Sequence, residues 1–253
     1  MARVLCITLN PALDLAFNLD ALVLGSVNRP RSAQLEAAGK GVNVARVLAG
    51  LGHHVTVSGF LGSENDAPFA LAFKQLDLID AFVRVPGSTR INAKLAEQGG
   101  RVTDINGPGM PIDATHLHTL ITSLEAELNS ATPPQAVVVA GSLPPGLSLD
   151  DFGQLLAHLN THGVPLWVDT SGAALKAAID VHPAGVKPNE SELAEWAGGA
   201  LDTIPARLAA ATRLHQNGIA HALVSAGDEG VLWVNAQGAW HATPGALGVH
   251  PKH

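Results

Sequence analysis

The sequence has little cysteine, few basic residues and no long hydrophobic run. Its single cysteine, Cys6, lies in an apolar stretch, which excludes a disulfide framework and indicates a buried thiol in a reduced compartment. No window reaches the roughly 18 uninterrupted apolar residues of a membrane span, and the first ten residues lack the pattern of a secretory signal. We therefore predict a cytoplasmic protein that has no membrane partner.

Positive charge is scarce as well. Lysine and arginine total 15 against 22 aspartates and glutamates, which gives a formal net charge of -7, and the basic residues form no run. Because nucleic acids bind surfaces on which lysine and arginine cluster, this composition argues against such a partner. We predict no nucleic-acid partner.

What the sequence does have is a large apolar fraction, 47% of 253 residues, and a regular alternation of two patterns. Short β-rich runs bounded by Gly, Pro or Asn alternate with longer segments of helical periodicity, which is typical of βα units and a parallel sheet. We expect strands at 4–10, 55–61, 136–140, 166–169, 185–187 and 222–225, and helices at 42–51, 68–76, 114–129, 149–162, 173–181 and 204–217. The fold class predicted is α/β, with a mainly parallel central sheet and helices on both faces.

One region breaks this alternation. Residues 82–85, 91–97 and 101–105 carry period-two patterning, with turns at Pro86-Gly87 and Gly99-Gly100, and favour an antiparallel hairpin or meander. Together with residues 15–35, they predict a small β-sheet that flanks the main sheet as a lid.

Glycines surround Lys40 just before the helix expected at 42–51. Gly39 and Gly41 permit close backbone approach, the start of a helix favours anions, and Lys40 adds a positive charge. The segment is not a Walker A loop, because no glycine stands at the required distance before Lys40 and no Ser or Thr directly follows it. It is either an anion or ligand site or a plain turn into a helix.

Two further segments follow expected strands. Asn189 and Glu192 are three residues apart on a helix start and share one face, which suits hydrated Mg²⁺, although an exposed polar helix start has the same pattern. The glycine-rich run 225–230 is suited to a nucleotide phosphate or to an ordinary hairpin turn. Gly141 to Gly146 also follows a strand, where open α/β sheets bind ligands.

Arg90, Asn92 and Lys94 alternate along one expected strand and therefore share a face. Such a row is usually solvated, but opposite a phosphosugar it forms a clamp, because arginine can contact phosphate bidentately. The sequence has no Gly-x-Ser-x-Gly elbow, no Gly-x-Gly-x-x-Gly and no zinc-ligand pattern, which argues against a serine hydrolase, a dinucleotide oxidoreductase and a structural zinc.

Taken in order, these segments resemble the ribokinase-like PfkB sugar kinases over essentially the whole chain. The resemblance rests on six motifs, listed here as they stand: Thr8-Leu9-Asn10-Pro11-Ala12-Leu13-Asp14, Ala38-Gly39-Lys40-Gly41 with Asn43-Val44-Ala45, Thr89-Arg90-Ile91-Asn92, Gly141-Ser142-Leu143-Pro144-Pro145-Gly146, Lys187-Pro188-Asn189, and the run from Ser225 to Gly230. Lys94 after Arg90-Ile91-Asn92, and Val102-Thr103-Asp104, make the chain more similar to the bacterial 1-phosphofructokinase branch than to ribokinase, with tagatose-6-phosphate kinase as a near neighbour.

The resemblance implies a ribokinase-like kinase domain over 1–253, lid strands at about 15–35 and 82–105, and ATP and Mg²⁺ as cofactors. It implies a set of substrate-binding residues: Asp14, Gly39, Lys40, Asn43, Arg90 and Asn92. It also implies a set of nucleotide-binding residues, Lys187, Asn189, Glu192, Ser225, Gly227 and Gly230, of which Asn189 and Glu192 lie by the metal and contact it through water.

The sequence departs from the family at its end. The family continues into a Gly-Ala-Gly-Asp motif whose Asp is the general base, whereas here Ala242-Thr243-Pro244 is followed by Gly245-Ala246-Leu247-Gly248-Val249-His250-Pro251-Lys252-His253. We therefore expect a C-terminally incomplete domain with no identified catalytic base, little turnover, and apolar surface exposed near Leu223, Leu232 and Val234.

The function implied is ATP-dependent phosphorylation of fructose 1-phosphate to fructose 1,6-bisphosphate. The alternatives are a tagatose-6-phosphate kinase and a catalytically inactive protein that binds sugar phosphate or nucleotide. The small-molecule partner expected is a sugar phosphate, and a lid sheet with exposed edges makes a homodimer through the lid a further expectation.

Overall fold

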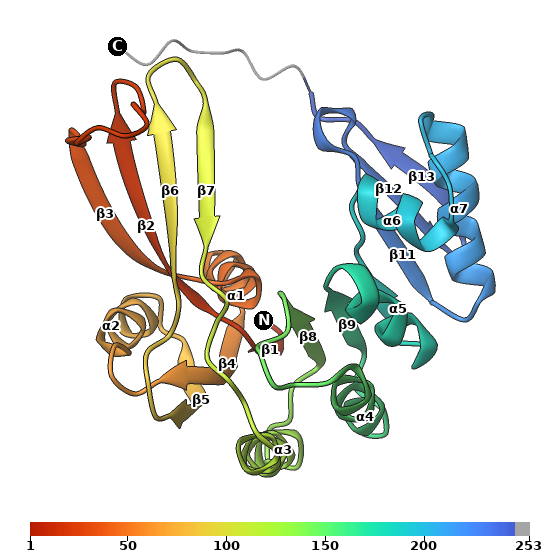
Figure 1. The fold of residues 1–253 in the computed structure, drawn as a ribbon. Coiled ribbons are helices and arrows are strands. Elements are labelled where there is room, and N and C mark those ends of the chain that lie inside the picture. Colours follow the sequence, from red (N-terminus) through yellow and green to blue (C-terminus); the bar gives the residue numbers. More distant parts are fainter. Residues whose placement is uncertain (246–253) are drawn as a thin grey trace. The chain divides into compact units, whose positions relative to one another are not determined.

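The computed structural model describes residues 1–245 and divides the chain into two compact units, Met1–Ser148 (unit 1) and Leu149–His253 (unit 2) (Figure 1). The fold is α/β, with mainly parallel strands, helices around them and a smaller second sheet. No described helix is long and apolar enough to cross a membrane. The expectation of a single kinase domain stays a prediction.

Four parallel strands form the main-sheet part of unit 1: β1 (Arg3–Thr8), β4 (His54–Gly62), β5 (Ile79–Val85) and β8 (Ala136–Ala140). β1 lies between β4 and β8, and β5 adds on the far side of β4. Leu5, Cys6 and Ile7 are fully buried in β1, as expected of a strand that is covered on both faces.

Three helices pack around these strands: α1 (Lys40–Gly50), α2 (Ala67–Gln75) and α3 (Ala114–Leu128). One core cluster joins Cys6 of β1 to Val42 of α1 and to Phe69 and Phe73 of α2. α3 contacts β4 and β5. The start of α1 is therefore fixed at the carboxyl end of β1.

The smaller sheet also belongs to unit 1. Its strands are β3 (Ser32–Ala38), β2 (Ala12–Leu19), β6 (Ile91–Glu97) and β7 (Val102–Asn106), in that order. β2 pairs antiparallel with β3 and parallel with β6, and β6 pairs antiparallel with β7. The strands predicted at 91–97 and 101–105 are confirmed, and the β6–β7 hairpin has the predicted antiparallel sense.

The prediction that residues 82–85 belong to the lid is wrong. They are part of β5, which pairs in parallel with β4, with Phe82 opposite Gly59. Phe82 is buried and stacks on Phe73 at 5.6 Å between ring centroids. Burial against α2 places this segment in the main sheet, and its period-two pattern does not distinguish an edge strand from a lid strand.

Unit 2 contains three parallel strands, β9 (Leu166–Asp169), β10 (Gly185–Val186) and β11 (His221–Ser225), followed by antiparallel β12 (Val231–Asn235) and β13 (Gly238–Ala242). Its helices are α4 (Leu149–Asn160), α5 (Gly172–Asp180), α6 (Glu190–Ala197) and α7 (Ile204–Gln216). The predicted strands and helices of both units are confirmed to within two or three residues at each end. β13 escaped prediction because all five of its residues are exposed, so it has no apolar alternation.

The apolar surface predicted near Leu223, Leu232 and Val234 needs correction. Leu232 and Val234 are buried in the cluster that joins α7 to β11 and β12. Alternation along β12 instead turns Val231 and Trp233 to the other face, where they are about 40% exposed. Leu223 pairs with Trp233 and is partly exposed, so the prediction holds at that position. Residues 246–253, which hold most of the departure from the family pattern, lie outside the described part of the chain.

Candidate active site

The first turn of α1 lies against the end of β1 because two positions are glycine. Gly39 has a φ of +130°, and a Cβ at Gly41 would stand 2.3 Å from the Thr8 hydroxyl oxygen and 2.9 Å from the Ile7 carbonyl oxygen. α1 has neither a capping side chain nor an acidic residue in its first turn. Its first backbone N–H groups therefore lack intrahelical partners beside Lys40, an arrangement that favours an anion or a polar ligand.

Asp14 and Asn92 lie opposite each other on β2 and β6. The Asn92 Nδ2 donates to Asp14 Oδ1 at 3.0 Å, while Asn92 Oδ1 is buried and accepts no hydrogen bond from the described residues. A cavity of about 180 Å³ lies on this polar face, lined by Asp14, Ala16, Gln34, Glu36 and Lys94. Carboxylate, carbonyl and ammonium groups around one cavity suit a ligand rich in hydroxyl groups.

Arg90 lies at the start of β6 and contacts several segments of unit 1. It donates to the carbonyl oxygens of Pro11 at 3.2 Å, Gly107 at 3.0 Å and Asn10 at 2.9 Å, and to the Ser142 hydroxyl at 3.4 Å. Burial lowers the pKa of Arg90, and the charge of Asp14 acts in the opposite direction. The side chain thus ties the lid strand to the Gly141–Gly146 loop, and its contact with a substrate phosphate stays a prediction.

In unit 2, the segment after β10 lies beside the segment after β11. The Ser225 N–H donates to the Pro188 carbonyl at 3.1 Å, and Asn189 forms a parallel bridge with Ser225. The Lys187 Nζ is 3.1 Å from Asp169 Oδ2 at the end of β9. Predicted nucleotide residues that are almost 40 positions apart are therefore neighbours.

Asn189 and Glu192 form a capping box at the start of α6. Asn189 Oδ1 accepts from the Glu192 N–H, and Glu192 Oε2 accepts from the Asn189 N–H, both at 2.8 Å. This box uses Asn189 Oδ1 and Glu192 Oε2 and leaves Glu192 Oε1 outside it, and a carboxylate oxygen suits a hydrated cation. Water-mediated contact with Mg²⁺ stays a prediction. In residues 1–245 no group of three or more His, Cys, Asp or Glu side chains forms a metal site.

The loop after β11 contains a short 3₁₀ turn, Gly227–Glu229, which begins at one glycine of positive φ and is followed by another. Gly227 has a φ of +54° and Gly230 of +98°, and a Cβ at Gly230 would stand 2.0 Å from the Ala242 carbonyl oxygen. Only glycine is readily accommodated at Gly230, so this part of the loop keeps its backbone accessible.

Sequence reasoning missed Arg207 on α7. It is 8% exposed, and its Nη1 pairs with Glu229 Oε2 at 2.5 Å and Glu190 Oε1 at 2.7 Å. The signal was present, since Arg207, Ala210, Ala211 and Leu214 follow the spacing of a buried helix face. An arginine at a buried position of that face indicates that acidic partners are nearby.

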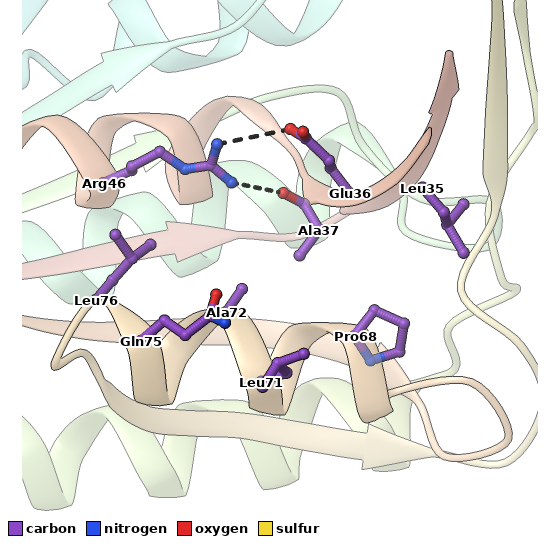
Figure 2. Close-up of a pocket in the computed structure, with 9 residues that line it drawn as sticks. All are labelled: Leu35, Glu36, Ala37, Arg46, Pro68, Leu71, Ala72, Gln75 and Leu76. Atoms are coloured by element: carbon purple, nitrogen blue, oxygen red, sulfur yellow. Dashed lines mark hydrogen bonds and ion pairs between the residues drawn. The ribbon is translucent and has the colours of Figure 1, made fainter. Parts of the chain in front are cut away.

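A second cavity in unit 1 shares only Glu36 with the lining of the first. It measures about 340 Å³ between β3, α1 and α2, and none of the predicted site residues lines it (Figure 2). Arg46 on its wall donates to the Ala37 carbonyl at 3.1 Å and lies 3.8 Å from Glu36. We assign this cavity no role in the site.

Comparison with known proteins identifies the family. The model of the pfkB family carbohydrate kinases matches residues 6–246. The chain is 42% identical over 242 residues to the 1-phosphofructokinase of Vibrio cholerae serotype O1, covering 96% of this chain and 75% of the relative. It is 43% identical over 245 residues to that of Haemophilus influenzae, covering 96% and 77%.

Solved structures agree with this result. Phosphofructokinase-2 from Escherichia coli in complex with fructose-6-phosphate superposes with a TM-score of 0.90 at 27% identity, covering 98% of this chain and 81% of that one. The family match spans nearly all described residues and includes both groups of predicted site residues. The chain belongs to the pfkB family of carbohydrate kinases.

Proposed function

We propose that the chain transfers a phosphoryl group from ATP to fructose 1-phosphate, giving fructose 1,6-bisphosphate. The observation that carries the proposal is the Asp14–Asn92 pair on the polar face of the small sheet, in a chain about 40% identical to several 1-phosphofructokinases. Phosphoryl transfer depends on positioning and charge neutralisation more than on covalent chemistry, and polar pairs of this kind position a sugar.

In unit 1, we assign sugar binding to Asp14 and Asn92, which accept from and donate to hydroxyl groups, and to the first turn of α1 with Gly39, Lys40 and Asn43. Arg90 provides the positive charge for the phosphate that the substrate already carries. Its partners among the described residues are carbonyl and hydroxyl oxygens, so its charge is not cancelled by an ion pair.

In unit 2, we assign nucleotide binding to Lys187, Ser225, Gly227 and Gly230. Asn189 and Glu192 hold the start of α6 and, through Glu192 Oε1, orient water on Mg²⁺. The metal, when bound, neutralises phosphate charge during transfer. We assign no general base among the described residues.

The proposal is tested by coupled ADP release with the 253-residue protein, using fructose 1-phosphate, tagatose 6-phosphate and fructose 6-phosphate. We expect the highest kcat/KM with fructose 1-phosphate. A preference for tagatose 6-phosphate would replace the substrate and keep the chemistry. Calorimetric binding of sugar phosphate and ATP without ADP release would replace the kinase with a binding protein. If the protein binds neither sugar phosphate nor ATP, the proposal is overturned.

We propose further that the protein forms a homodimer through one face of the small sheet. Register places Leu15, Leu35, Ala93 and Ile105 in one row on the face opposite Asp14 and Lys94, and Leu35 and Ile105 are about half exposed. An apolar row on one sheet face is self-complementary about a two-fold axis. Escherichia coli phosphofructokinase-2, a structural neighbour, has a tetrameric form.

Light scattering of two lysine variants of β7 tests this assembly. Ile105→Lys places a charge on the apolar face, and we expect it to halve the mass in solution. Val102→Lys places the same charge on the opposite face of the same strand and leaves the mass unchanged. Equal masses for both variants would refute the interface.

A further inference from the structure

Arg207 joins three segments of unit 2. From α7, its Nη1 reaches Glu190 at 2.7 Å and Glu229 at 2.5 Å, and its Nε donates to the Leu201 carbonyl oxygen at 2.9 Å. Hydrogen bonding to Glu229 raises the pKa of Arg207. The guanidinium therefore stays charged and is held at several points.

Each of the two acidic partners lies within one or two positions of residues that we place at the nucleotide site. Glu190 is the first residue of α6 and directly follows Asn189, while Glu229 lies between Gly227 and Gly230. Arg207 thus bridges the two segments that would lie along a triphosphate.

The loop that holds Glu229 needs such a tether. Gly227 and Gly230 contribute backbone freedom, and no residue of the Gly227–Glu229 turn is buried. Among residues 1–245, its other hydrogen bonds are backbone bonds between Ala226, Gly227, Glu229 and Gly230, and a 2.7 Å contact between the His241 Nε2 and the Glu229 carbonyl oxygen. A loop held mainly by its own backbone gains order when an exposed side chain at its tip pairs with a buried arginine.

We propose that Arg207 is a positioning residue for nucleotide binding, which holds the Gly227–Gly230 loop against the start of α6 in the conformation that accepts the phosphates. The inference rests on the proposed function. We assign Arg207 no phosphate contact of its own, because it acts through Glu190 and Glu229. Its effect comes from preorganisation, because a loop that is already ordered loses less entropy when the ligand binds.

The test compares Arg207→Met with Arg84→Met. Arg84 also bridges two carboxylates, Asp66 at 3.0 Å and Asp80 at 2.6 Å, but it lies on β5 in unit 1, apart from the assigned ligand residues. Both variants remove a doubly paired guanidinium, so loss of stability alone would affect them alike. Dissociation constants for ATP and for fructose 1-phosphate are measured separately by calorimetry.

We expect Arg207→Met to raise the Kd for ATP by about tenfold or more and to leave the Kd for fructose 1-phosphate unchanged, with Arg84→Met altering neither. Arg207→Lys, which keeps the charge, restores part of the ATP affinity. Should Arg207→Met fail to fold, Glu229→Gln removes the loop's ion pair alone, and we expect a smaller ATP-selective loss.

Two results overturn the inference while the proposed function stands: ATP affinity that is unchanged in Arg207→Met and Glu229→Gln, or equal losses for both ligands. Wild-type protein that binds neither ligand instead overturns the proposed function, and the inference falls with it.

Discussion

The two units each place a buried or half-buried arginine beside a predicted ligand segment, and the two side chains have different partners. Arg90 in unit 1 donates to three carbonyl oxygens and one hydroxyl, and burial lowers its pKa. Arg207 in unit 2 pairs with two carboxylates, and its pKa is raised. Neutral acceptors orient a guanidinium without cancelling its charge, whereas two carboxylates neutralise it. Arg90 is therefore suited to attract an anionic ligand, and Arg207 is suited to hold protein segments together.

The largest effect is expected from the backbone that supports the unit 1 site. Gly41→Ala places a Cβ 2.3 Å from the Thr8 hydroxyl oxygen and against the Ile7 carbonyl, which forces α1 away from β1. We expect a loss of about 2 to 4 kcal/mol in unfolding free energy and no measurable binding of fructose 1-phosphate. Gly50→Ala at the other end of α1 meets no atom within 4 Å and serves as the control, with stability unchanged or slightly increased. If the two variants behave alike in urea unfolding and calorimetry, the close packing of Gly41 against β1 does not support the site.

The second-largest effect is expected when Arg90 loses its positive charge. Arg90→Met should weaken fructose 1-phosphate binding by about tenfold to 150-fold, since a charge-assisted contact contributes about 1.5 to 3 kcal/mol, and should change affinity for unphosphorylated fructose far less. Calorimetry with both sugars measures the difference. If both affinities fall alike, Arg90 is a structural tie between the lid and the Gly141–Gly146 loop, and the contrast with Arg207 disappears.

A smaller loss is expected at the sugar hydroxyls. Asp14→Asn keeps the size of the side chain and removes its charge, so we expect fructose 1-phosphate affinity to fall about tenfold while ATP affinity stays constant. Asp104→Asn, on exposed β7 of the same sheet, is the matched control and should alter neither. Parallel losses for sugar phosphate and ATP in Asp14→Asn would remove Asp14 from the sugar site.

Two intrinsic probes report on the units separately. Cys6 is the only cysteine and lies in unit 1, where burial raises its thiol pKa to about 12, while all four tryptophans lie in unit 2. We expect the native thiol to resist alkylation at pH 8 and to react as unit 1 unfolds. Arg84→Met should lower the urea midpoint of thiol alkylation, and Arg207→Met that of tryptophan fluorescence. Coincident shifts of both probes in each variant would mean that the units unfold together.

The smallest effect is a pH dependence at Asp80. Burial alone raises the pKa of Asp80, but hydrogen bonds from Arg84 and the Phe82 N–H and the Arg84 charge bring it below its ordinary 3.8. Because the folded-state pKa is the lower one, this contribution to stability is present above about pH 4 and is lost as pH falls through the folded value. The stability difference between wild type and Asp80→Asn, measured by urea unfolding, should therefore shrink below pH 4. A difference that grows toward low pH would contradict the assignment.

The sequence by itself determined which segments become strands and helices, because apolar periodicity and Gly, Pro and Asn punctuation act locally. Buried β1 and the helix that starts at Lys40 were predicted in this way, and so was the order of motifs that is shared with the sugar kinases. The glycines around Lys40 were expected to allow close approach, and Gly41 does lie against Thr8 and Ile7. The backbone freedom of a glycine is visible in the sequence, whereas the segment that packs against it is not.

Tertiary structure alone decided which partners the polar side chains take. Phe82 joined the main sheet because α2 provides Phe73 for it to stack on, and Leu232 and Val234 faced α7 while Trp233 turned away. Arg90 found its acceptors up to 80 positions away, and Arg207 found Glu229 across 22 positions. A pattern of alternating residues predicts whether a side chain is buried or exposed. The atom that the side chain contacts belongs to a segment distant in the sequence, and only tertiary packing brings the two segments together.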